Sequence, residues 1–283
     1  MLTGPAAAED ALREVYFHDL AKNRIGNVII AQTNPETEIL VFSGGELALE
    51  GDNLVIIARH ARIDGDTIIR SFRQPARAAL PGEPHQAAGG ANGANKGDPG
   101  GNGAAGASGI AGNNGASAGK VVLRIGEVTG RGRLIVDLYG QGGGKGQNGG
   151  QGGDGGKGRD GKARVCGGAD PQDGGDGGWG GIGGQGGAGG RGGNGGIVVY
   201  SKALAALIAS GRFQAEATTG KAGVGGDPGE AGNPGSGGVG GAGVLGCGAG
   251  GNDGAPGGRT SGAQPGPAGL PGSAGTAIEE ETQ

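Results

Sequence analysis

Apolar residues in this chain are gathered into short islands, and three of the islands repeat one another. Residues 54–72 align without gaps with residues 121–139, and residues 197–218 form a third copy that carries a three-residue insertion. Apolar and polar positions alternate at Leu134 and Val136, which is typical of a half-buried strand. Each copy therefore predicts a strand, a turn and a second strand.

Repeats of this kind usually stack, because neighbouring units bury apolar surface that one unit cannot bury alone. We expect the copies to form one β domain. Its three parts are residues 51–72, 120–140 and 197–219.

Glycine fills the stretches between the islands, and its spacing has a period of three. The chain has 78 glycines in 283 residues. The clearest tract is an unbroken X-Gly-Gly run in which X is Asp173, Asp176, Trp179, Ile182, Gln185, Ala188, Arg191 and Asn194. This period predicts a left-handed helix of polyproline-II shape with the X side chains on one edge and bare backbone on the other two. Since backbone N–H and C=O groups need partners, we expect such helices to lie side by side as polyglycine II.

The glycine-rich excursions span residues 73–119, 141–196 and 220–277. In the second and third, one triplet tract leaves the β domain, an irregular bend follows, and a tract of similar length returns. Each excursion is therefore predicted to be a hairpin of two rods. A rod of 24 residues would be roughly 74 Å long, so we expect an elongated molecule.

The two cysteines of the chain occupy matching places in successive hairpins. Cys166 and Cys247 both follow the last outgoing triplet by a few residues. We predict a Cys166–Cys247 disulfide and, with it, an oxidising final location. The alternative is a pair of buried free thiols.

Residues 1–50 contain little glycine and have no counterpart in the repeats. Residues 6–22 place Leu12, Val15, Tyr16 and Leu20 on one face, which predicts an amphipathic helix. Two apolar strands follow, and they are candidate assembly contacts: Val28, Ile29, Ile30, Ile39, Leu40, Val41 and Phe42. These strands could add to the sheet edge of a neighbouring subunit, or they could cap their own β domain. The pattern predicts a polar tail at residues 278–283.

The glycine content alone is also compatible with a disordered chain or with collagen. Compositions this rich in glycine are typical of disordered chains, but a flexible linker needs no triplet phase. Collagen needs far more than the 13 prolines present here. Short collagen-like segments within a polyglycine-II bundle fit better.

Charge and motifs select no ligand. The 23 basic and 27 acidic residues alternate in sign along the triplets, so there is no basic face for nucleic acid. The apolar runs are too short to cross a membrane, and residues 1–20 lack the features of a cleavable signal peptide. We expect either export by another route, including lysis, or a leader that lies outside this sequence. The three histidines are scattered, and the glycine-aspartate stretches near residues 152–160 lack the apolar positions of calcium-binding repeats. We predict no enzymatic activity, no cofactor and no metal.

The triplet tracts over residues 97–277 resemble those of two groups of proteins. One comprises subunits of bacterial extracellular nanofilaments, in which β domains carry glycine-helix or collagen-like rods. The other comprises the glycine-rich adhesins at the tips of some phage tail fibres, which place aromatic-rich loops between the rods. The bends at residues 162–172 and 244–253 contain no aromatic residue, which favours the filament group.

The sequence as a whole indicates a mainly β protein with little α-helix, carrying stacked hairpins of polyglycine-II rods. The filament resemblance implies a structural subunit that joins copies of itself head to tail at the cell surface or outside the cell. A tail-fibre adhesin that binds a cell-surface receptor is the alternative. An ice-binding protein is third, because the mixed side chains of the edge from Asp173 to Asn194 do not form a regular surface of small residues.

Overall fold

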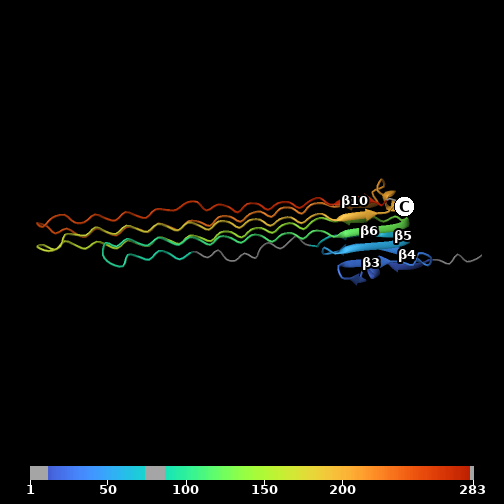
Figure 1. Ribbon diagram of the computed structural model, residues 1–283, viewed down its shortest axis with the longest axis horizontal. Helices are drawn as coiled ribbons and strands as arrows, with labels where there is room; N and C mark the ends of the chain where they lie inside the picture. The colour runs from blue at the N-terminus through green and yellow to red at the C-terminus, as the bar shows by residue number, and fades with distance from the viewer. Residues whose placement is uncertain (1–11, 74–86, 281–283) are drawn as a thin grey trace, which may run out of the picture.

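A computed structural model describes residues 12–73 and 87–280. The molecule is elongated: strands gather at one end, and long extended segments project from them in one direction (Figure 1). The prediction of a mainly β protein with little α-helix is confirmed. The strands are β1 (Arg13–Tyr16), β2 (Arg24–Ile25), β3 (Val28–Gln32), β4 (Glu38–Ala48), β5 (Asn53–Arg70), β6 (Lys120–Gly130), β7 (Leu134–Asp137), β8 (Ile197–Tyr200), β9 (Phe213–Glu216) and β10 (Thr276–Glu279), and the helices are α1 (Phe17–Leu20) and α2 (Lys202–Ala205).

The strands form one sheet in the order β1-β4-β5-β6-β8-β10, and every neighbouring pair along this path is parallel. On a second branch β7 lies between β5 and β9, again in parallel. Leu54 pairs with Val121 and Val121 with Val198, so equivalent positions of successive chain segments lie side by side. The chain thus advances by one strand layer each time it returns from a glycine-rich excursion.

Apolar side chains from these layers pack into one core. Leu54, Leu123 and Val198 are fully buried along the first branch, and Leu134 and Phe213 along the second. Because the strands are parallel and in register, like residues stack on like and the alternating pattern is buried on a single face.

Two strands differ from the sequence prediction. The first repeat has no separate turn: β5 runs unbroken through Gly65, where a Cβ atom would lie 2.5 Å from the Ser43 carbonyl oxygen. At the other end, β10 begins at Thr276 inside the predicted glycine excursion and includes the start of the predicted polar tail. It pairs with β8, and this pairing orders a segment whose own pattern predicts no strand.

The predicted N-terminal helix over residues 6–22 is wrong for the part that the structure describes, since residues 1–11 lie outside it. Residues 13–16 form β1 instead, and only residues 17–20 form the single turn α1. β1 pairs in parallel with β4, and Phe17 packs against Phe42 with ring centroids 5.0 Å apart. Helix propensity is a weak preference, and here the tertiary pairing overrides it.

The seven candidate assembly residues lie in β3 and β4, and both strands pair with β5 of the same chain. Ile29, Leu40, Val41 and Phe42 are buried, while the other three are half-buried. In the structure these strands therefore belong to their own β domain, which is the second of the two alternatives that the sequence left open.

Charged side chains on successive strands form a row across the second branch. Arg70 lies 3.3 Å from Glu46 and is in register with Asp137, which is itself in register with Glu216. Burial and the facing Glu216 carboxylate raise the pKa of Asp137, and Arg70 opposes this rise. The folded protein therefore holds the Asp137 proton more tightly than the unfolded chain, and stability is lost as the pH rises through the folded pKa.

Glu216→Gln is expected to lower the pKa of Asp137 and to raise stability at neutral pH by a few tenths of a kcal/mol, because like charges directly opposite on paired strands repel. Carboxyl NMR titration and urea melts would measure both effects, and the gain should vanish at a pH where Asp137 is protonated. Glu279→Gln, on the exposed strand β10, is the control. An unchanged pKa of Asp137 in Glu216→Gln would contradict this account.

Candidate functional site

Within residues 87–280, six extended segments make up the long part of the molecule, and we call them rods. They are rod 1 (residues 87–93), rod 2 (98–118), rod 3 (140–161), rod 4 (173–196), rod 5 (218–243) and rod 6 (251–275). Rods 1, 3 and 5 run outward from the β domain, and rods 2, 4 and 6 return to it. The hairpin of rods 1 and 2 turns back before the other two hairpins do (Figure 1).

Backbone hydrogen bonds join the rods at every third residue. Gly143, Gly146 and Gly149 of rod 3 donate to carbonyl groups of rod 5 over 2.8–2.9 Å. The next residue in the triplet donates across to the returning rods, as Gly144 does to Asn113 of rod 2. The outward rods thus form one layer, the returning rods form a second, and each central rod is bonded within and between the layers.

Glycine is required where two rods approach each other. A Cβ atom on Gly178 would lie 1.9 Å from the Gly101 carbonyl oxygen, and one on Gly187 would lie 2.0 Å from that of Ile110. No side chain fits at such a distance, which is why the central rods 3 and 4 carry two glycines in most triplets.

The outermost rods 5 and 6 carry prolines on the face that no further rod covers. The backbone N–H of Asp227 donates to the Asn148 side chain, which makes Asp227 of rod 5 the equivalent of Asn148 of rod 3. The residue after each is then also equivalent, so Pro228 has the triplet position that Gly149 has in rod 3. Gly149 donates its N–H to the next rod, and proline has no N–H to donate. The same triplet phase holds Pro234 on rod 5, and the matching phase on rod 6 holds Pro256, Pro265 and Pro271. The prolines therefore interrupt the row of backbone N–H donors on the outer face of rods 5 and 6. The stack of described rods ends at this face, after the third hairpin.

The edge predicted from the X-Gly-Gly run lies on rod 4, and its polar side chains bond the neighbouring rod. Asp173, Asp176 and Asn194 each accept a hydrogen bond from a backbone N–H of rod 6, over 2.6–2.9 Å. Trp179 is 54% exposed, and its ring lies over Gly258 of rod 6. This edge mainly holds two rods together. The remaining edge residues are Ile182, Gln185, Ala188 and Arg191.

The predicted disulfide is confirmed: Cys166 and Cys247 are bonded, with Cα atoms 5.6 Å apart. The bridge joins the bends of the second and third hairpins. Arg164 supports it by donating from Nη1 to the Cys247 carbonyl oxygen over 2.8 Å. Val165 and Leu245 are exposed beside the bridge, so the far end of the rods carries apolar side chains.

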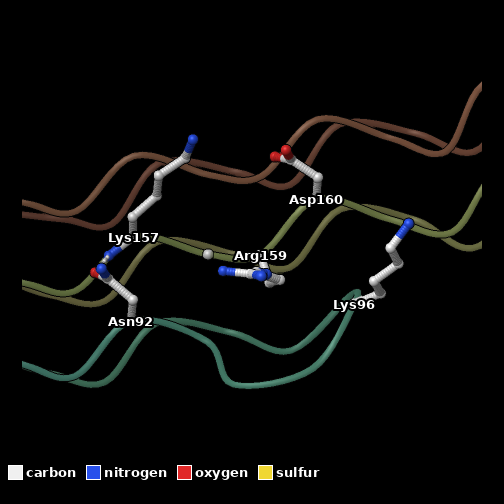
Figure 2. A pocket seen from close by; sticks show the side chains of 6 residues that line it. Asn92, Lys96, Lys157, Arg159 and Asp160 are labelled. Atoms are coloured by element: carbon white, nitrogen blue, oxygen red, sulfur yellow. Dashed lines mark hydrogen bonds between the residues drawn. The ribbon is translucent and has the colours of Figure 1, made fainter.

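A hollow of about 400 Å³ lies where the turn of the first hairpin meets rod 3. It is lined by Asn92, Lys96, Lys157, Gly158, Arg159 and Asp160. Figure 2 shows Lys157 and Lys96 on either side of Arg159, with Asp160 on the same segment as Arg159. This hollow was not predictable from the sequence, because its lining comes from two hairpins that only the rod contacts bring together.

No metal site or membrane span emerges from the described residues. No group of three or more His, Cys, Asp and Glu side chains is placed there to hold a metal ion. A search of the same residues for a helix of sufficient length and apolarity to cross a bilayer finds none.

Comparisons with known proteins give little likeness. No protein-family model and no curated protein matches the chain. Among solved structures, a springtail antifreeze protein from Granisotoma rainieri, a bundle of nine polyproline type II helices, is 25% identical over 66% of this chain and 94% of its own. The TM-score of 0.10 is too low to indicate a shared fold.

Proposed function

We propose that this protein is a structural subunit that assembles head to tail into an extracellular filament, and that its rods are polyglycine-II helices carried by a β domain of stacked repeats. The observation that carries this proposal is the ladder of backbone hydrogen bonds at every third residue, with glycine at each close approach. A ladder of that period is what polyglycine II requires. The proposal assigns no catalytic residue and no cofactor.

Rigidity follows from the number of bonds that each rod makes. A single glycine helix loses much conformational entropy and gains little, since each hydrogen bond contributes about 0.5–1.5 kcal/mol. Central rods bonded on several sides gain much more for the same entropy loss. The disulfide at the far end supports this interpretation and also suits an oxidising, extracellular compartment.

We place the contact between subunits in the sheet. β3 and β4 are already paired within the chain, and the rod stack ends on prolines. The outermost strands along the sheet path are β1 and β10, and both run parallel to the strands between them. We infer that β10 of one copy pairs with β1 of the next, since an unpaired edge readily accepts a strand.

Ala277→Pro is the sharpest test of this contact. Thr276 donates its N–H to Gly196, just before β8, and Glu280 donates to Tyr200 of β8. Because successive N–H groups point to opposite sides of a strand, the N–H of Ala277 faces the outer edge. Proline there removes an outward donor and leaves the pairing with β8 intact. We expect long filaments from the natural sequence in negative-stain electron microscopy and particles of a single subunit from Ala277→Pro. Ala268→Pro, between Pro265 and Pro271 on the outer face of rod 6, should still form filaments.

Two results would contradict the proposal. Discrete short particles of the natural sequence at all concentrations would exclude a filament. Unchanged filaments from Ala277→Pro would exclude β10 as the contact.

A receptor-binding adhesin is the second candidate, favoured by one observation. The exposed Val165 and Leu245 lie at the far end of the rods, beside the disulfide that holds the two bends together. Binding of fluorescent protein to intact cells, lost in the double variant Val165→Ser/Leu245→Ser while the particles stay short, would favour the adhesin over the filament.

A further inference from the structure

The hollow beside the first hairpin gathers positive charge on a chain that is negative overall. Lys96, Lys157 and Arg159 contribute three cations, while the formal net charge of the chain is −4. Lys145, on the same rod as Lys157 and Arg159, faces Asp227 at 3.5 Å. Within residues 12–73 and 87–280, by contrast, none of these three cations takes part in an ion pair.

The acids nearest in sequence to these cations are held by other groups. Oδ1 of Asp160 accepts the backbone N–H of Val239 over 2.9 Å. Oδ2 of Asp98 accepts both the backbone and the side-chain N–H of Asn95. These carboxylates serve the rod contact and the hairpin turn, so the cations remain available to a ligand.

Apart from the Asp160 carboxylate, the side chains that line the hollow offer donors. Oδ1 of Asn92 accepts the backbone N–H of Lys157 over 2.8 Å, which leaves the Asn92 amide nitrogen as a donor. Lysine ammonium and arginine guanidinium groups have donors and no acceptor. Three cations and the single carboxylate of Asp160 give the lining a net charge of +2. A volume of about 400 Å³ is in the range of small-ligand sites.

We propose that this hollow binds a doubly charged oxyanion, a sulfate or phosphate group. Arginine forms paired hydrogen bonds with such groups, and the flanking lysines add charge. The group could be a free ion or a phosphate ester on a sugar. The proposal is independent of filament assembly, because it involves no residue of β1 or β10.

The test is a titration of the full-length protein with inorganic sulfate, inorganic phosphate and glucose 6-phosphate, followed by NMR of the lysine side chains. The double variant Lys96→Gln/Lys157→Gln removes two of the cations and keeps most of each side chain. Lys202→Gln/Lys221→Gln removes the same charge from exposed positions away from the hollow and is the matched control.

We expect saturable shifts at Lys96 and Lys157, an affinity at least about tenfold weaker in the first double variant, and a change of less than about twofold in the control. Tighter binding of glucose 6-phosphate than of inorganic phosphate would assign the site to a phosphate ester, and the reverse order to a free ion. Equal weakening in both double variants, or shifts in the natural sequence that do not saturate, would overturn the proposal.

Discussion

Gly143→Ala is expected to separate rods 3 and 4, whereas Gly142→Ala, one residue earlier, is expected to leave the bundle intact. A Cβ atom on Gly143 would lie 2.1 Å from the Gly190 carbonyl oxygen of rod 4. A Cβ atom on Gly142 has the Lys221 carbonyl oxygen as its nearest neighbour, at 3.8 Å. The two substitutions add the same methyl group to the same rod, so only the spacing of the rods distinguishes them.

The Gly143→Ala protein should lose about 3 kcal/mol of stability or more, since an overpacked contact costs about 1–3 kcal/mol and the displaced rod also loses backbone hydrogen bonds. Calorimetry should then show a Tm lower by about 6 °C or more. Gly142→Ala should stay within about 0.5 kcal/mol of the natural sequence. Equal Tm values for the two variants would mean that the rods are not in contact at Gly143.

Removing the disulfide is expected to have the second large effect. The double variant Cys166→Ser/Cys247→Ser opens a loop closed over a sequence separation of 81 residues. Loss of such a crosslink enlarges the conformational freedom of the unfolded chain and should cost about 4 kcal/mol. The bends should loosen first, because few groups other than Arg164 tie them together across the hairpins.

Calorimetry with and without dithiothreitol measures this effect. The reductant should lower the Tm of the natural sequence to that of the double variant and should leave the double variant unchanged. A natural protein whose Tm does not respond to reductant, although its thiols become reactive, would show that the bridge adds no stability.

Much of the arrangement follows from local pattern. The 67-residue offset that aligns the first two repeats in the sequence is also the register in which Leu54 pairs with Val121. The disulfide was predictable for the same reason, because Cys166 and Cys247 occupy matching places in successive hairpins. When equivalent segments stack in order, equivalent residues become neighbours.

The proline positions could be interpreted only with the structure. In the sequence, Pro228 and Pro271 lie in Gly-X-Y stretches that suggest short collagen-like pieces. The rod contacts give these prolines a different role, because they occupy triplet positions at which a central rod would donate its N–H to the next rod. Which of two exposed triplet positions faces a neighbour depends on the packing, and the glycine period alone leaves this open.

The sequence by itself determined the β islands, the triplet rods and their pairing into hairpins, because these depend on spacing along the chain. Only the tertiary structure decided the conformation of residues 13–16, which pair with β4 as a strand instead of forming a helix. It also placed β3 and β4 in their own sheet and brought Lys96 beside Lys157 and Arg159. These outcomes depend on contacts between segments far apart in the sequence. Such contacts produce no periodic pattern of residues within either segment.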